Sequence, residues 1–98
     1  MSLEVGFRAK ARAEFVEAAA WYEARRPGLG AEFIAEIERC VSGAAQQPEL
    51  YAVVHRGLRR VVVRRFPYSV YFRLEAGRAV VFAVFHGSRD PRTWQRRR

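Results

Sequence analysis

The strongest constraint on the fold is an uninterrupted apolar run at residues 79–85, Ala-Val-Val-Phe-Ala-Val-Phe. A strand with one face in water alternates apolar and polar residues, whereas a continuous run of β-branched and aromatic residues favours a strand buried on both faces. Either two antiparallel neighbours flank this strand, or it lies centrally with helices covering one face. Polar residues follow at once, beginning with His86, so we expect the strand to leave the core there, on the rim of the sheet.

Two earlier segments have the period of helices with one buried face, because their apolar residues recur at three- and four-residue steps. The first segment carries Phe15, Ala18, Ala19 and Tyr22, and the second carries Phe33, Ile37, Cys40, Val41 and Ala44. Residues 26–30, Arg-Pro-Gly-Leu-Gly, separate them, since proline cannot continue a helix and glycine can close one. The pattern predicts a helical hairpin, with Cys40 as a core thiol rather than a reactive one.

The remaining segments have the composition of strands. Residues 3–7, 50–55, 58–64 and 67–74 are β-branched, aromatic or alternating, with turns at Arg56-Gly57 and at residues 75–78. The order of elements predicts an α+β fold: an N-terminal strand, a two-helix hairpin, then an antiparallel meander of three or more strands, with the helices packed on one face of the sheet. We expect residues 1–98 to form a single domain with a basic C-terminal tail at 92–98.

Composition excludes several classes of protein. No apolar run approaches the roughly 20 residues that cross a membrane, and the N-terminus lacks the apolar segment of a signal peptide, so we expect a cytoplasmic protein with no membrane partner. Cys40 is the single cysteine, and His55 and His86 are the only histidines. We therefore expect neither a disulfide framework nor a metal or other cofactor.

Charge is unevenly distributed along the chain. Up to Glu49, six basic residues face eight glutamates, whereas from Leu50 onward twelve arginines face only Glu75 and Asp90. Arginine is suited to bidentate contacts with phosphate or carboxylate. The asymmetry predicts a polyanionic partner, either a nucleic acid or an acidic protein segment.

Several short motifs, in this order and spacing, resemble the RelE/ParE superfamily of bacterial toxins. They are Trp21-Tyr22-Glu23, Pro27-Gly28-Leu29-Gly30, Phe33, Glu36-Ile37, Pro48, the segment Arg64-Arg65-Phe66-Pro67-Tyr68-Ser69-Val70-Tyr71 and the terminal His86-Gly87-Ser88-Arg89-Asp90-Pro91. The resemblance extends from about Val5 to Trp94. It implies the toxin of a type II toxin–antitoxin (plasmid stabilisation) system, held by a cognate acidic antitoxin in a toxin–antitoxin hetero-oligomer.

The superfamily includes both ribosome-dependent messenger-RNA endonucleases and poisons of DNA gyrase. In the RelE-like nucleases an arginine directly follows the residue that matches Tyr68, but here that position is Ser69. Their ladder of lysines is replaced by Val61-Val62-Val63, and the tyrosine expected after the matching Arg89 is replaced by the Trp94-Gln95 region. The resemblance is therefore nearer to the ParE-like branch, which implies a toxin that binds gyrase without doing chemistry.

His86 leaves the nuclease alternative open, because histidine can exchange protons near neutral pH. A ribosome-dependent endonuclease acting on messenger RNA would use His86 together with Arg64, Arg65 and Arg89. Two other interpretations are a cap on the last strand, in which Asp90 pairs with an arginine, and a non-catalytic contact with the target. A non-toxic nucleic-acid-binding module is a further alternative for the whole chain.

The expected surface for the target or the antitoxin consists of the exposed basic and aromatic residues of the second half. It comprises Arg64, Arg65, Arg73, His86, Arg89, Arg92 and Trp94. Trp94 lies among arginines and is predicted to be an exposed anchor. Substituting both Trp94 and Arg89 should therefore abolish toxicity without unfolding the domain. Tyr68 and Tyr71 should point to opposite faces of one strand, mostly into the core.

Overall fold

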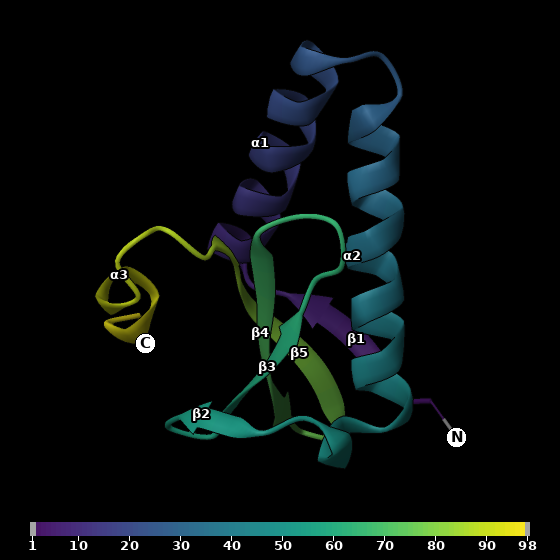
Figure 1. Ribbon diagram of the computed structural model, residues 1–98. Coiled ribbons are helices and arrows are strands. Elements are labelled where there is room, and N and C mark those ends of the chain that lie inside the picture. Colours follow the sequence, from purple (N-terminus) through teal and green to yellow (C-terminus); the bar gives the residue numbers. More distant parts are fainter. Residues whose placement is uncertain (1, 98) are drawn as a thin grey trace.

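The computed structural model describes residues 2–97 and contains the expected order of elements (Figure 1). They are β1 (Glu4–Phe7), α1 (Ala9–Arg25), α2 (Leu29–Gln46), the 3₁₀ turn η1 (Pro48–Leu50), β2 (Val53–His55), β3 (Leu58–Val62), β4 (Tyr68–Glu75), β5 (Arg78–His86) and the short α3 (Arg92–Gln95). The predicted α+β fold is confirmed, and a short helix at the C-terminus is added to it.

The strands form one five-stranded sheet in the order β1-β5-β4-β3-β2. Strand β5 lies in the interior of the sheet, between β1 and β4, as its apolar run predicts, and it pairs antiparallel with β4. Its other neighbour is β1, which pairs parallel to it with Glu4 opposite Arg78 and Phe7 opposite Val81. The period of the sequence cannot reveal this parallel pairing, because it joins segments some seventy residues apart.

Helices α1 and α2 cover one face of the sheet and enclose the main core. The largest fully buried side chains there include Phe33 and Ile37 of α2, Phe72 of β4 and Val81 of β5. Cys40 is 2 % exposed, and burial raises the pKa of its thiol, which confirms the predicted core position. The stripe of apolar residues on α2 is thus the contact between the hairpin and the sheet.

A bulge in β5 turns one extra side chain toward the opposite face. Tyr71 of β4 pairs with Ala83, and the next residue, Phe72, pairs with Val81, so Phe82 has no partner in the register. Phe82 and Ala83 belong to a second buried cluster, with Leu58, Tyr71, Phe85 and Trp94. Tyr68 packs instead against the main core, which confirms that the two tyrosines of β4 point to opposite faces.

Helix α3 covers part of this second face. In Figure 1 it lies on the other side of the sheet from α2.

No helix within residues 2–97 has the length and apolar character needed to cross a membrane. In the same part of the chain, no three His, Cys, Asp or Glu side chains gather closely enough to hold a metal ion.

Candidate functional site

A groove of about 460 Å³ lies between α1 and the ends of β4 and β5. We call it the α1–β5 groove. Its lining consists of Glu14, Glu17, Ala18, Trp21, Tyr22, Pro67, Tyr68, Val84, His86 and Arg89. The groove therefore combines carboxylates from α1, aromatic rings from both layers, and two of the basic residues predicted for the site.

His86 stands at the end of β5 with one ring nitrogen already bonded. Its Nδ1 accepts a hydrogen bond from the backbone N–H of Ser88 at 3.0 Å and lies 2.8 Å from the Ser88 hydroxyl oxygen. The ring packs edge-on against Tyr68 with 5.1 Å between ring centres. Because Nδ1 accepts from a backbone N–H, a neutral ring carries its hydrogen on Nε2. These contacts match the interpretation of His86 as a strand cap.

Arg89 and the two tyrosines complete this end of the groove. The Arg89 guanidinium lies 4.5 Å from the centre of the Phe85 ring, and no carboxylate within residues 2–97 forms an ion pair with it. Burial raises the pKa of Tyr68 and also that of Tyr22. Both phenols therefore stay protonated at neutral pH and can donate hydrogen bonds, but they are poor bases.

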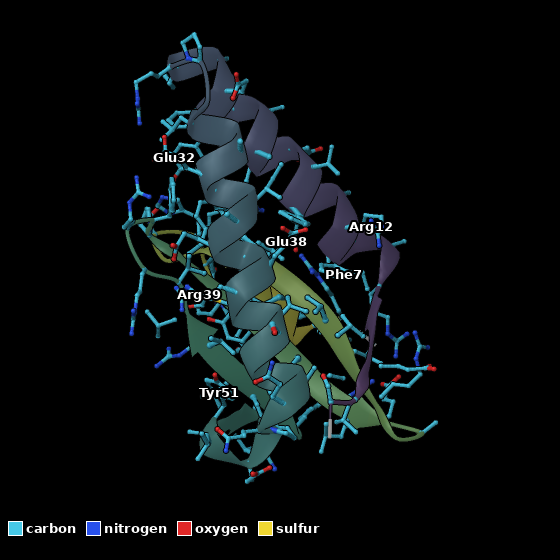
Figure 2. All side chains as sticks on the ribbon, turned by 90° about the vertical axis from the view of Figure 1, so that its right-hand side faces the viewer. Phe7, Arg12, Glu32, Glu38, Arg39 and Tyr51 are labelled. Atoms are coloured by element: carbon cyan, nitrogen blue, oxygen red, sulfur yellow. The ribbon has the colours of Figure 1, made fainter. Side chains whose placement is uncertain are left out.

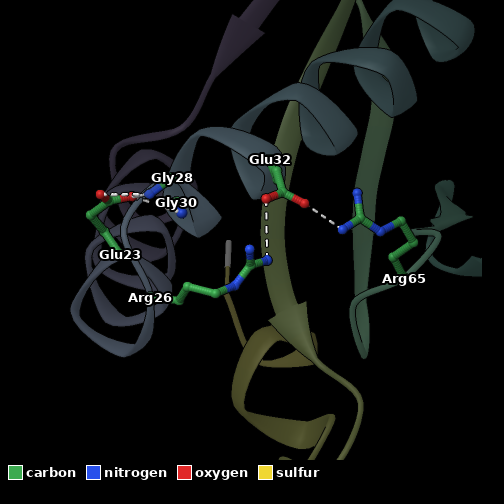
Figure 3. Close-up of polar contacts among 6 residues, drawn as sticks. All are labelled: Glu23, Arg26, Gly28, Gly30, Glu32 and Arg65. Atoms are coloured by element: carbon green, nitrogen blue, oxygen red, sulfur yellow. Dashed lines mark hydrogen bonds and ion pairs between the residues drawn. The ribbon is translucent and has the colours of Figure 1, made fainter.

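Arg64 and Arg65 do not join His86 and Arg89 in the groove. In Figure 3, Arg65 contacts one carboxylate oxygen of Glu32 and Arg26 contacts the other. The nitrogen–oxygen distances of these two ion pairs are 2.5 Å for Arg65 and 3.2 Å for Arg26. The hydrogen bond from Arg65 is the first cause of the lowered pKa of Glu32. Arg64 is exposed in the same loop. The four residues of the nuclease alternative are thus divided between two places.

Two further predicted arginines are occupied by carboxylates. The Arg73 Nε donates to Glu75 at 2.6 Å, and its guanidinium lies over the Phe82 ring on the second face of the sheet. Arg92 pairs with Asp90 at 2.7 Å, which confirms the expected partner for that carboxylate. Neither arginine lines the α1–β5 groove, so the basic residues of the second half do not converge on one point.

The predicted exposure of Trp94 is wrong. Trp94 is 2 % exposed, and its ring stacks on Tyr71 with 4.1 Å between centres and 29° between planes. His55 packs edge-on against it at 5.7 Å. The arginines around Trp94 in the sequence indicate a surface position, but the second face of the sheet offers an apolar site that an aromatic ring fills. Trp94 is therefore a core residue that attaches α3.

Sequence reasoning missed the contribution of α1 to the groove. Glu14, Glu17, Ala18 and Trp21 are spaced by three, four and seven residues, which places them on one face of the helix. Trp21 is 53 % exposed, and the Arg25 guanidinium lies 4.1 Å from the centre of its ring, so Trp21 is a surface residue. The signal in the sequence is a helix face with carboxylates and an aromatic residue beside the apolar stripe of α1. That pattern could have predicted that α1 lines the groove.

A second groove, of about 450 Å³, lies between β1, α1 and α2 and was not predicted. In Figure 2 its rim includes Arg12 of α1, Phe7 of β1 and Glu38 of α2. The Arg12 guanidinium lies 5.1 Å from the centre of the Phe7 ring, which itself stacks on Phe15. This groove is mostly apolar with one cation and one carboxylate at its rim.

Solved structures that match this arrangement of strand, helical hairpin and mixed sheet define the class of fold. The chromosomal ParDE toxin–antitoxin system from P. aeruginosa has a chain that is 18 % identical, with a TM-score of 0.75, and the match covers 87 % of this chain and 96 % of that one. A chain of the toxin–antitoxin complex RelBE2 from Mycobacterium tuberculosis is also 18 % identical, with a TM-score of 0.57, covering 88 % and 99 %. At this identity the likeness shows the fold alone: this chain shares its fold with one chain of each of these two complexes.

The sequence itself narrows the class to a family. A family profile described as the ParE toxin of the type II toxin–antitoxin system parDE matches residues 5–91. The chain belongs to this ParE toxin family, which confirms the resemblance seen in the motifs. Comparison with curated protein sequences gives no match.

Proposed function

We propose that this ParE-family toxin arrests growth by binding DNA gyrase and interfering with its DNA-rejoining cycle, without cleaving any bond itself. In the resting cell a cognate antitoxin holds it in a toxin–antitoxin complex in the cytoplasm. An acidic, amphipathic segment of the antitoxin fits the +8 net charge of the chain and its concentration in the second half. Membership of the ParE family supports the antitoxin partner.

The observation that carries the choice of gyrase is the dispersal of the basic residues. Cleavage of messenger RNA needs a base, cations around the developing charge on phosphorus and an acid for the leaving oxygen, all at one place. His86 and Arg89 line the α1–β5 groove, whereas Arg65 is paired with Glu32 elsewhere. A binding surface tolerates such dispersal, because each arginine contacts a different part of the partner.

We expect Arg89 to contribute more to the binding of the target than any other residue. It is exposed, it has no carboxylate partner within residues 2–97, and it rests on the buried ring of Phe85, which limits its mobility. An arginine held in this manner loses little entropy on binding. Arg64 and Arg92 are exposed as well, but neither lines the groove with Arg89, and Arg92 is partly neutralised by Asp90.

The test uses purified gyrase, relaxed circular DNA and the purified toxin. We expect inhibition of supercoiling and accumulation of cleaved DNA bound to gyrase. Arg89→Ala should weaken this effect about tenfold or more, as substitution of a central arginine in an interface does. Arg39→Ala on α2 is the matched control, since it removes the same charge at an exposed ion pair with Glu36.

A second reaction separates the alternatives. Full-length messages in a translating extract that stay intact while gyrase is inhibited support the proposal. Messages cut in the extract, with gyrase unaffected, would overturn it in favour of an endonuclease using His86. Salt-sensitive binding of free DNA or RNA with neither effect would indicate the non-toxic binding module.

A further inference from the structure

Beyond Val81, one edge of strand β5 is covered by no other strand within residues 2–97. Its parallel partner β1 ends at Phe7, opposite Val81, and the backbone N–H of Arg8 donates to the Val81 carbonyl at 2.9 Å. Strand β5 continues to His86, where only β4 remains beside it. Backbone groups along such an edge need hydrogen-bond partners, and an unprotected edge can pair with other chains.

Two side chains supply these partners. The Glu14 Oε1 accepts a hydrogen bond from the backbone N–H of Val84 at 3.0 Å. Arg97 Nη1 donates to the Phe82 carbonyl at 3.1 Å and to Glu14 Oε1 at 3.2 Å, and Nη2 pairs with the other oxygen of Glu14. A carboxylate from α1 and a guanidinium from the C-terminus thus take the acceptor and donor positions of a missing strand.

This ion pair differs from the others in its burial. The side chains of Arg97 and Glu14 are 12 % and 14 % exposed, and every other ion pair within residues 2–97 leaves both of its side chains more exposed. Water therefore competes little for the contact, and removing either partner would leave a charge with poor solvation. The sequence hides this role, because Arg97 lies in a run of arginines typical of a mobile tail.

Arg97 also fixes the helix that precedes it. Helix α3 has four residues, too few to be stable without tertiary contacts. Its attachments are the buried ring of Trp94 and the side chain of Arg97, whose backbone N–H donates to the Trp94 carbonyl at 3.1 Å. The loop between β5 and α3 carries Arg89, so its position depends on both of its ends.

We propose that Arg97 is a positioning residue of this toxin. Together with Glu14 it replaces a strand along β5 beyond Val81, and it holds α3 on the second face of the sheet. By doing so it fixes Arg89 and Arg92 in the surface that meets the target. The last of these statements rests on the proposed function, whereas the first two concern the folded chain alone.

The geometry explains why the residue is an arginine. The planar guanidinium has several donors and reaches a carboxylate and a carbonyl at once, which the single ammonium of lysine does less well. Arg97→Lys should therefore restore the contact only in part. Exchanging the charges, as Glu14→Arg with Arg97→Glu, keeps an ion pair but leaves the Val84 N–H and the Phe82 carbonyl without correct partners.

The first experiment measures the exposure of Trp94. The chain has two tryptophans, so Trp21→Phe makes Trp94 the only fluorescent one. In this background we expect Arg97→Ala to increase acrylamide quenching of Trp94, while Arg96→Ala, which removes the same charge from an exposed position, does not. Equal quenching in the two variants would overturn the proposal.

The second measurement is amide hydrogen exchange at Val84. Arg97→Ala should speed it by about tenfold, the factor expected for weakening one hydrogen bond, and Arg97→Lys should give an intermediate rate. The charge-exchanged variant should stay as fast as Arg97→Ala. Restoration of slow exchange by the charge exchange would show a simple ion pair, which contradicts the replacement of a strand.

The positioning role is tested with the gyrase reaction at a temperature where circular dichroism shows every variant folded. Arg97→Ala should inhibit gyrase about tenfold less than Arg96→Ala, with Arg97→Lys between them. Full inhibition by folded Arg97→Ala would overturn the positioning of Arg89 and Arg92. If the wild-type chain leaves gyrase unaffected, the proposed function fails, and quenching and exchange still decide the contact with β5.

Discussion

Replacing Trp94 tests most directly whether the C-terminus is part of the core. Its side chain is 2 % exposed and stacks on Tyr71 within the second buried cluster. Removal of a buried tryptophan side chain costs about 3–5 kcal/mol, from lost burial and the cavity left behind. Small domains are stable by about 5–15 kcal/mol, so Trp94→Ala should remove a large part of the stability of this fold.

Trp94→Phe tests how much the packing of the aromatic ring contributes to stability apart from the indole N–H. Within residues 2–97 no group accepts a hydrogen bond from the buried Trp94 Nε1, and an unpaired buried donor costs about 1–3 kcal/mol. Phenylalanine retains an aromatic face against Tyr71 but has no such donor, so the lost area and the removed donor offset one another. We expect the free energy of unfolding of this variant to lie within about 1.5 kcal/mol of the wild type.

The assay is urea unfolding followed by far-ultraviolet circular dichroism. With a slope near 1.5 kcal/mol per molar, typical of small domains, the midpoint of Trp94→Ala should fall by about 2–3 M. The matched control is Trp21→Ala, which removes the same side chain from a position that is 53 % exposed and should change stability by about 0.5 kcal/mol. A loss below about 1 kcal/mol for Trp94→Ala, at an unchanged slope, would refute the packing of α3. Trp94 would then return as a candidate for direct contact with the target.

Three further predictions concern the helices, the thiol and the ion pairs. Gly30→Ala should destabilise the fold by about 1–3 kcal/mol in urea unfolding, despite the better helix propensity of alanine, because the new methyl group would lie 2.7 Å from the Ala19 carbonyl oxygen; a stabilised variant would show that the helices can move apart. Cys40 should react with a thiol reagent only as the chain unfolds, since it is 2 % exposed and burial raises its pKa; native-state labelling at the rate of a free thiol would contradict this. The hydrogen bond from Arg73 lowers the pKa of Glu75 in the folded chain, so this pair stabilises fully above the unfolded pKa near 4.5 and is lost as pH falls through the lower folded value. Glu75→Gln should therefore reduce the loss of stability on acidification below about pH 5, and an unchanged pH profile would show that the pair contributes nothing.

The candidate site could be predicted only in part. His86 and Arg89 follow the apolar run directly, and a strand that leaves the core must place such residues at the rim. Their neighbours in the groove come from α1, and an amphipathic pattern shows which face of a helix is polar but not which strand end it approaches. Arg65 illustrates the same limit, since its pairing with Glu32 depends on a loop in which Arg65 has the left-handed φ of 70°.

Local sequence determined the helical hairpin, the strands and the interior position of β5, because helical and strand periods and an unbroken apolar run are properties of neighbouring residues. Tertiary structure alone decided the parallel pairing of β1 with β5, the burial of Trp94 and the role of Arg97. The last two depend on which groups remain unsatisfied after the sheet has formed: an open edge at Phe82 and Val84, and an apolar area beside Tyr71. The open edge and the apolar area arise from the packing of segments that are distant in the chain. The geometry of the fold therefore determines which residues cover them, and the neighbours of those residues in the sequence do not.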